Sequence, residues 1–351
     1  MKKRKIYLIV FLLVSMLAGM VSGCSSTDGR VEKNAGKIYL YGERHGIESI
    51  LEAEFDLWYD YYHNDGMRHL FIESSYYAGE LLNLWMKSED DQILDQLFIE
   101  QAGTLGSTPY NKEFYKKIKK ECPDTIFHGT DIGHQYDSTG HRYLQYLKEE
   151  GKEDSEQYQL AEEAIAQGRY YYTHEDEVYR EDKMVENFTR EFDSLKSESV
   201  MGIYGSAHTD PEAFNYTGQV DCMAKQIKQR YGDILYSEDL TTTVEIEPEK
   251  VEVLEIEGKE YKASYFGAEN VTGMVDGFTQ LEFWRIENAY DDFKHKSYIQ
   301  DSLPSNNYPT EIKIGDVWLV EATKADGSIL KLYYRCDGNV CITNGFRIDE
   351  T

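Results

Sequence analysis

The sequence has 351 residues and a formal net charge of −27, and 41% of its residues are hydrophobic. A chain of this length and composition can bury a real core in one large domain or two, which excludes disorder outside its N-terminal tether. A chain this acidic repels phosphate groups, so DNA and RNA are excluded as partners.

The first 23 residues have the pattern of a bacterial lipoprotein signal peptide. Four basic residues precede a nearly unbroken apolar run over 6–20, and the small residues of VSGC lead to Cys24. We therefore predict cleavage before Cys24 and attachment of acyl chains such as palmitate to this residue. The lipid would hold the protein on the extracytoplasmic face of the cell membrane. An uncleaved signal anchor is the alternative, because about 18 apolar residues can span a bilayer.

Cleavage would leave 328 residues with a net charge of −31. The polar segment 24–36 is predicted to be a flexible tether. From 37 to 240, short apolar runs alternate with helical patterns. The runs typical of strands are KIYLY, RHLFIE, DTIFHGTD, VMGIYG and DILYS. Helical spacing covers 47–63, AGELLNLWM, DQILDQLFIEQ, YNKEFYKKIKKE, much of 137–196, and 221–230. This alternation predicts an α/β domain with a largely parallel sheet flanked by helices.

From 241 the pattern changes to alternating polar and apolar residues separated by glycine turns. Strands are predicted in TTTVEIEPEKVEVLEI, EIKIGDVWLVEA and SILKLYYRC, so 241–351 is expected to form a small β-rich domain. Cys336 and Cys341 flank Asp337-Gly338, a dipeptide that favours hairpin turns. We predict a Cys336–Cys341 disulfide, which is allowed outside the cytoplasm, with a metal site as the alternative.

The ends of the first four predicted strands carry acids and histidines. They read YGERHG, FIESS, HGTDIGH and YGSAHTD. Because ligands bind at the carboxyl ends of parallel strands, we expect these side chains to converge on one rim. Each of them could instead cap a helix or lie in a loop, but their coincidence at four strand ends favours a site. The residues are Glu43, His45, Glu73, Asp131, His134 and His208.

The helical segment THEDEVYREDKMVENFTREF adds polar groups to this set. Arg180, Met184 and Asn187 lie at i, i+4 and i+7 and therefore share one face. This face is expected to contact the rim; the alternative is a solvated helix with arginine–acid pairs. The preceding RYYYT could supply aromatic walls to a pocket or could simply pack.

Two chemistries fit these residues. A histidine beside carboxylates can act as a general base on water, with a carboxylate fixing its tautomer. Alternatively, two histidines and two carboxylates can hold Mn²⁺, Co²⁺ or Zn²⁺, which lowers the pKa of bound water. That ligand set would be Glu43, His45, Glu73 and His208. The sequence contains no G-x-S-x-G, no H-E-x-x-H and no phosphate-cradling loop.

In their order and spacing, YGERHG, LFIES, REDKMVEN and GIYGSAHT resemble the superfamily of the erythromycin esterases, the haem-binding lipoprotein ChaN and the Tiki/TraB proteins. The resemblance covers Lys37 to Ser237. It implies that His45 is the catalytic base or a metal ligand, and that Glu43 is its acidic neighbour with the spacing of the Tiki and ChaN types. The other matched positions are Glu73, Arg180, Met184, Asn187 and His208.

We therefore expect a membrane-anchored extracytoplasmic hydrolase that cleaves an ester or peptide bond of a small molecule or peptide. His45 would activate water with Glu43 and Glu73, with or without a divalent metal. His208 would orient the substrate or donate a proton, and Arg180 would stabilise an oxyanion. Substrate binding is assigned to Asp131, His134 and Asn187. The alternatives are a ChaN-like lipoprotein that binds haem or a metal, and a catalytically inactive adhesion module.

Overall fold

The computed structural model describes residues 36–215, 217–244, 246–272, 277–299, 308–310, 312–337 and 344–346. The predicted signal peptide, Cys24 and Cys341 lie outside these ranges, so the lipid anchor and the Cys336–Cys341 disulfide stay predictions. Within the described ranges, no helix combines the length and the apolar character needed to cross a membrane.

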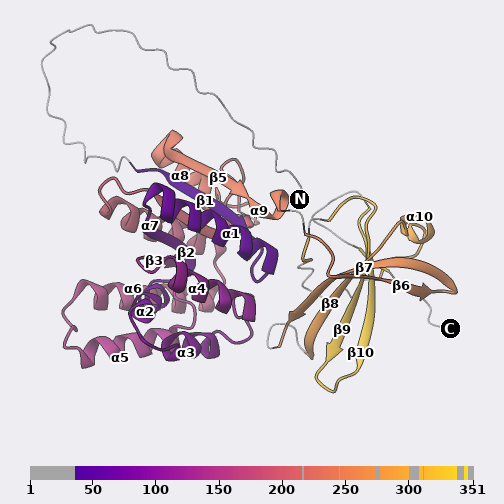
Figure 1. Ribbon diagram of the computed structural model, residues 1–351, viewed down its shortest axis with the longest axis horizontal. Helices are drawn as coiled ribbons and strands as arrows, with labels where there is room; N and C mark the ends of the chain where they lie inside the picture. The colour runs from indigo at the N-terminus through magenta and orange to yellow at the C-terminus, as the bar shows by residue number, and fades with distance from the viewer. Residues whose placement is uncertain are drawn as a thin grey trace, which may run out of the picture. The chain divides into compact units, whose positions relative to one another are not determined.

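The first sheet has five parallel strands in the order β3-β2-β4-β1-β5 (Figure 1). They are β1 (Ile38–Glu43), β2 (His69–Ser75), β3 (Ile126–Asp131), β4 (Val200–Gly205) and β5 (Leu235–Asp239). Each coincides with one of the apolar runs, which confirms the prediction of a parallel α/β sheet. Strand β4 lies between β1 and β2, and Glu43 pairs with Gly205 at its end. The carboxyl ends of β1, β4 and β2 are therefore adjacent.

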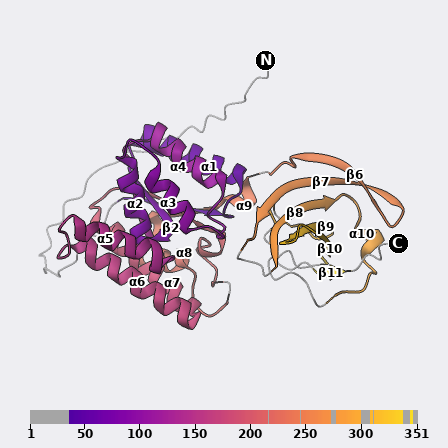
Figure 2. The same ribbon diagram turned by 90° about the horizontal axis from the view of Figure 1, so that it is seen from below.

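Helices pack around this sheet (Figure 2). They are α1 (Glu48–Asp60), α2 (Tyr76–Met86), α3 (Gln92–Glu100), α4 (Pro109–Glu121), α5 (His141–Glu149), α6 (Glu156–His174), α7 (Glu177–Ser194) and α8 (Met223–Tyr231). Helices α1 to α6 contribute to one apolar core, and α7 and α8 to a second. Cys122 belongs to the first core and Cys222 to the second, which explains why both are buried free thiols. Helix α7 begins after Asp176, whose side chain accepts a hydrogen bond from the Tyr179 amide.

The second sheet is antiparallel, in the order β11-β10-β9-β8-β7-β6. Its strands are β6 (Lys250–Ile256), β7 (Lys259–Asn270), β8 (Phe278–Ile286), β9 (Val317–Lys324), β10 (Ile329–Arg335) and β11 (Asn344–Phe346), with the short helix α10 (Tyr290–Phe293) after β8. This confirms a β-rich C-terminal region. Alternate residues enter two apolar clusters, Leu319 one and Trp318 the other.

The strand predicted from residue 241 is wrong at its start. Leu240–Thr243 form the short helix α9, because the Asp239 side chain accepts a hydrogen bond from the Thr241 amide. Strand β6 begins only at Lys250.

Candidate active site

A cavity of about 450 Å³ opens at the carboxyl edge of the parallel sheet. Strands β1, β2 and β3 and the loops after them supply most of its charged side chains, and α7 supplies an arginine. The predicted site residues that line it are Glu43, His45, Glu73, Asp131, His134 and Arg180. His208 and Asn187 are only 5% and 4% exposed and are not among the described residues that line the cavity.

Glu43 orients His45 within this cavity. The His45 Nδ1–H donates to Glu43 Oε1 at 2.8 Å, and Nε2 lies 3.8 Å from Glu73 Oε2. Burial lowers the pKa of His45, but Glu43 and Glu73 raise it more, to about 9. The imidazole is therefore protonated at neutral pH and becomes a base as the pH approaches 9.

A carboxyl group that the sequence analysis missed supports Glu43. Glu54, in α1, is fully buried. Both of its oxygens and Oε2 of Glu43 lack a hydrogen-bond donor among the described residues if both groups are carboxylates. Burial and the neighbouring Glu43 raise the pKa of Glu54 well above its ordinary value. A protonated Glu54 would donate a hydrogen bond to Glu43 and so supply the hydrogen that these buried oxygens lack. The signal for it was an acid in the same helical stripe as the apolar Leu51 and Trp58.

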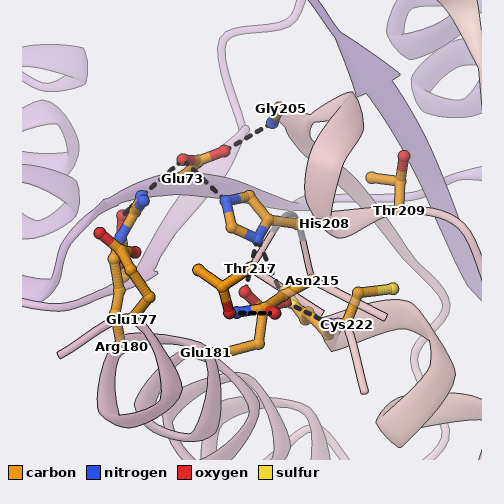
Figure 3. Close-up of polar contacts among 12 residues, drawn as sticks. Glu73, Glu177, Arg180, Glu181, Gly205, His208, Thr209, Asn215, Thr217 and Cys222 are labelled. Carbon is orange, nitrogen blue, oxygen red and sulfur yellow. Dashed lines mark hydrogen bonds and ion pairs between the residues drawn. The ribbon is translucent and has the colours of Figure 1, made fainter. Parts of the chain in front are cut away.

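Glu73 is the centre of a charge network (Figure 3). Its Oε1 accepts from Arg180 Nη2 at 2.7 Å, and its Oε2 accepts from the Gly205 amide. Burial raises the pKa of Glu73, but His208, His45 and Arg180 lower it more, to about 2. A Cβ atom at Gly205 would lie 3.2 Å from Glu73 Oε2 and 3.3 Å from His45 Nε2, so glycine lets the backbone amide approach this carboxylate.

His208 contacts Glu73 but does not line the cavity. It ends the turn η3 (Ser206–His208), and its Nε2 lies 3.7 Å from Glu73 Oε1. Its Nδ1–H donates at 2.8 Å to Glu181 Oε2, a second acid that the sequence analysis missed (Figure 3). Glu181 also accepts from the Met223 amide at the start of α8. Burial lowers the pKa of His208, but Glu73 and Glu181 raise it above its ordinary value. The buried imidazole of His208 thus positions Glu73 and is not among the described residues that line the cavity.

Arg180 joins Glu73 to Asp131. Its Nε and Nη2 donate to the two carboxylate oxygens of Asp131 at 3.2 and 2.6 Å. Burial raises the pKa of Asp131, but Arg180 and His134 hold it well below its usual range. The two carboxylates balance the charge of the guanidinium. The contacts of Arg180 therefore support a role in positioning Glu73 and Asp131 more than the predicted role in binding an oxyanion.

The loop after β3 carries another histidine–carboxylate pair. His134 Nε2–H donates to Asp131 Oδ2 at 2.8 Å, and the Tyr77 hydroxyl donates to the His134 carbonyl. Asn187, which was assigned to substrate binding, donates instead to Gln167 and to the Asp131 carbonyl. It therefore supports the end of β3 from beneath the cavity.

The arrangement of these side chains does not fit a metal ion. The described ranges contain no group of three or more His, Cys, Asp or Glu residues placed to hold one. The predicted ligands are already engaged: the Nδ1 atoms of His45 and His208 bind carboxylates, and Glu73 binds Arg180. These contacts leave catalysis to the side chains themselves, and haem binding stays a prediction.

Comparison with known proteins gives a likeness of fold only. No protein-family model and no curated protein matches the chain. A solved Bacillus cereus protein has 12% identity and a TM-score of 0.41, over 59% of this chain and 66% of that one. A succinoglycan biosynthesis protein has 12% and 0.41, over 57% and 64%. A mutant of the erythromycin esterase EreC in its open conformation has 10% and 0.40, over 58% and 69%. The chain thus spans slightly less than two thirds of the first two structures, and no activity is taken from these likenesses.

Proposed function

We propose that this protein is a hydrolase in which the Glu43–His45 pair activates water against an ester or peptide bond. The observation that carries the proposal is the hydrogen bond from His45 Nδ1 to Glu43 Oε1 at the cavity wall. A carboxylate on one ring nitrogen fixes the tautomer in which the other nitrogen is the base. The side chain of His45 is 29% exposed and lines the cavity, which gives water and substrate access to the ring.

The attacking water has a defined place in this proposal. The 3.8 Å between His45 Nε2 and Glu73 Oε2 is too long for a direct hydrogen bond. A water bound between them can donate one hydrogen to each atom. Unprotonated His45 takes a proton from this water as its oxygen attacks the substrate carbonyl. Arg180, His208 and the Gly205 amide hold Glu73 ionised and fixed during the step.

We further propose that the enzyme acts on the extracytoplasmic face of the membrane through lipid on Cys24. The VSGC motif after an apolar run supports this placement. The substrate would be a small-molecule ester or a peptide. A polyanionic nucleic acid is excluded by the net charge of −27.

The test is a hydrolysis assay of the full-length chain, purified in detergent, on a panel of esters and peptides with a chelator present. We expect turnover that His45→Ala lowers by about 10²- to 10⁴-fold, the usual contribution of a general base. The control is His295→Ala, which removes an exposed histidine of the C-terminal region and should leave turnover unchanged. Full activity of His45→Ala, or no turnover of any member of the panel, would contradict the proposal.

A further inference from the structure

A tyrosine hydroxyl at the cavity is connected to a buried carboxylate through one imidazole. Tyr172, in α6, lines the cavity together with His134 and Asp131. Its hydroxyl lies 2.5 Å from His134 Nδ1, and His134 Nε2 lies 2.8 Å from Asp131 Oδ2. The two rings meet edge to face, with centroids 5.8 Å apart. Tyr172 is 49% exposed, so this chain of hydrogen bonds ends at a group that a substrate can reach.

The contacts of Asp131 determine where the protons of this chain lie. The Asp131 carboxylate is ionised and can only accept, so His134 Nε2 carries a hydrogen. When His134 is protonated, Nδ1–H donates to the Tyr172 oxygen and the phenol hydrogen is free to point into the cavity. Burial and the charge of Asp131 raise the pKa of Tyr172, so the phenol keeps its hydrogen at neutral pH. With hydrogens on both nitrogens of His134, the Tyr172 hydroxyl is therefore a hydrogen donor to the cavity, whereas with neutral His134 it donates to Nδ1.

Hydrolysis at this cavity requires a proton donor for the leaving group; His45 becomes one donor after it takes a proton from water, and a second group at the cavity can be another. An alkoxide or amide anion is too basic to leave a tetrahedral intermediate without a proton. His208 does not face the cavity, and the guanidinium of Arg180 is bound by two carboxylates. Tyr172 is a cavity-lining O–H group with a histidine–carboxylate pair behind it.

We propose that Tyr172 is the catalytic acid that protonates the leaving group, with His134 supplying the proton and Asp131 holding the imidazole; the inference rests on the hydrolase proposed above. As the C–O or C–N bond breaks, its electron pair stays on the leaving atom and takes the Tyr172 hydroxyl proton. The tyrosine oxygen takes the Nδ1 proton of protonated His134, and the neutral imidazole regains a proton from solvent.

This assignment narrows the substrate class. A proton donor is needed for alkyl esters and peptides, whose leaving groups are strongly basic. It is not needed for activated esters or anhydrides, whose leaving groups depart as stable anions. We therefore infer that the enzyme acts on alkyl esters or peptides.

The experiment compares an alkyl ester and a p-nitrophenyl ester of the same acid, because nitrophenolate leaves without a proton. Tyr172→Phe removes the hydroxyl and keeps the ring. We expect it to lower kcat about 10²-fold on the alkyl ester and less than about twofold on the nitrophenyl ester. His134→Gln should show the same leaving-group dependence. The matched control is Tyr170→Phe, on the same helix and 40% exposed but outside the cavity lining, which should change neither rate.

The outcomes separate the two proposals. If Tyr172→Phe slows both esters equally, or slows neither, Tyr172 is not the leaving-group acid, although hydrolysis that depends on His45 would still stand. If the unsubstituted chain hydrolyses neither ester nor any peptide, the hydrolase proposal fails and this inference fails with it. Circular dichroism of each variant shows whether a lost rate reflects lost folding.

Discussion

The carboxyl edge of the parallel sheet and the antiparallel C-terminal sheet differ in what they bury. At the edge, several ionisable side chains are 8% exposed or less. They are Glu43, Glu54, Asp131, Glu181 and His208. Within the described part of the C-terminal sheet, the buried polar side chains are Ser264 and Arg335, between two apolar clusters. Burying charges costs free energy, so stability does not explain the first group, whereas packing explains the second.

Two arginines bound by carboxylates, the partly buried Arg180 and the buried Arg335, sharpen this comparison. Arg180 is bound by Glu73 and Asp131 at the cavity. Arg335 donates to Asp337 and to the Phe293 carbonyl inside the C-terminal region. We expect either residue, when changed to Met, to lower the free energy of unfolding by about 3–5 kcal/mol, because its carboxylate partners lose their cation. Only Arg180→Met should also abolish turnover. Urea titration and ester hydrolysis at a temperature where both variants are folded measure the two effects. Equal loss of activity in both would show that the comparison does not separate function from packing.

The inferred hydrogen bond from a protonated Glu54 to Glu43 can be tested with two substitutions. Glu54→Gln keeps a hydrogen-bond donor toward Glu43 Oε2 and should change the free energy of unfolding little. Glu54→Ala leaves that buried oxygen without a donor and should cost about 1–3 kcal/mol. It should also weaken the orientation of His45 and reduce kcat. Thermal unfolding together with hydrolysis rates checks both effects. If Gln and Ala prove equally harmful, Glu54 does not act as a neutral donor.

The smallest effect is expected on the outer strand of the second sheet. Val253, in β6, is 65% exposed and is not one of the residues that line the cavity. Val253→Thr should change the free energy of unfolding by less than about 0.5 kcal/mol and leave turnover unchanged. A clear loss of activity in this variant would indicate that the C-terminal sheet takes part in the reaction.

The parallel sheet could be predicted because its strands are covered on both faces and read as short continuous apolar runs. The second sheet was harder to predict. Strand β7 changes register between Tyr265 and Ala268, where Gly267 has a φ of 97°, and this irregularity interrupts the alternation that marks a strand. The sequence of residues 240–243 favours neither a strand nor a helix. The hydrogen bond from the Thr241 amide to the Asp239 side chain stabilises the helical form.

The part of the candidate site that is formed by residues at the strand ends could be predicted from the sequence. Glu43, His45, Glu73, Asp131 and His134 could be placed together because parallel strands deliver their ends to one edge. The missed residues, Glu54 and Glu181, both lie in helices, as does Tyr172, which was expected at most as an aromatic wall of a pocket. Acids and tyrosines are frequent throughout this chain, and only tertiary packing determines which of them face the site.

The pH dependence of kcat/KM for a p-nitrophenyl ester tests the central claim most directly, because the claim is that unprotonated His45 activates water and this leaving group needs no proton from Tyr172. With a His45 pKa of about 9, the active fraction grows as the pH rises. The rate should therefore climb about tenfold per pH unit between roughly pH 6 and 8 and level off above about 9. His45→Ala should retain only the slow background reaction, without the plateau. A rate that stays flat or falls across this range would contradict the account.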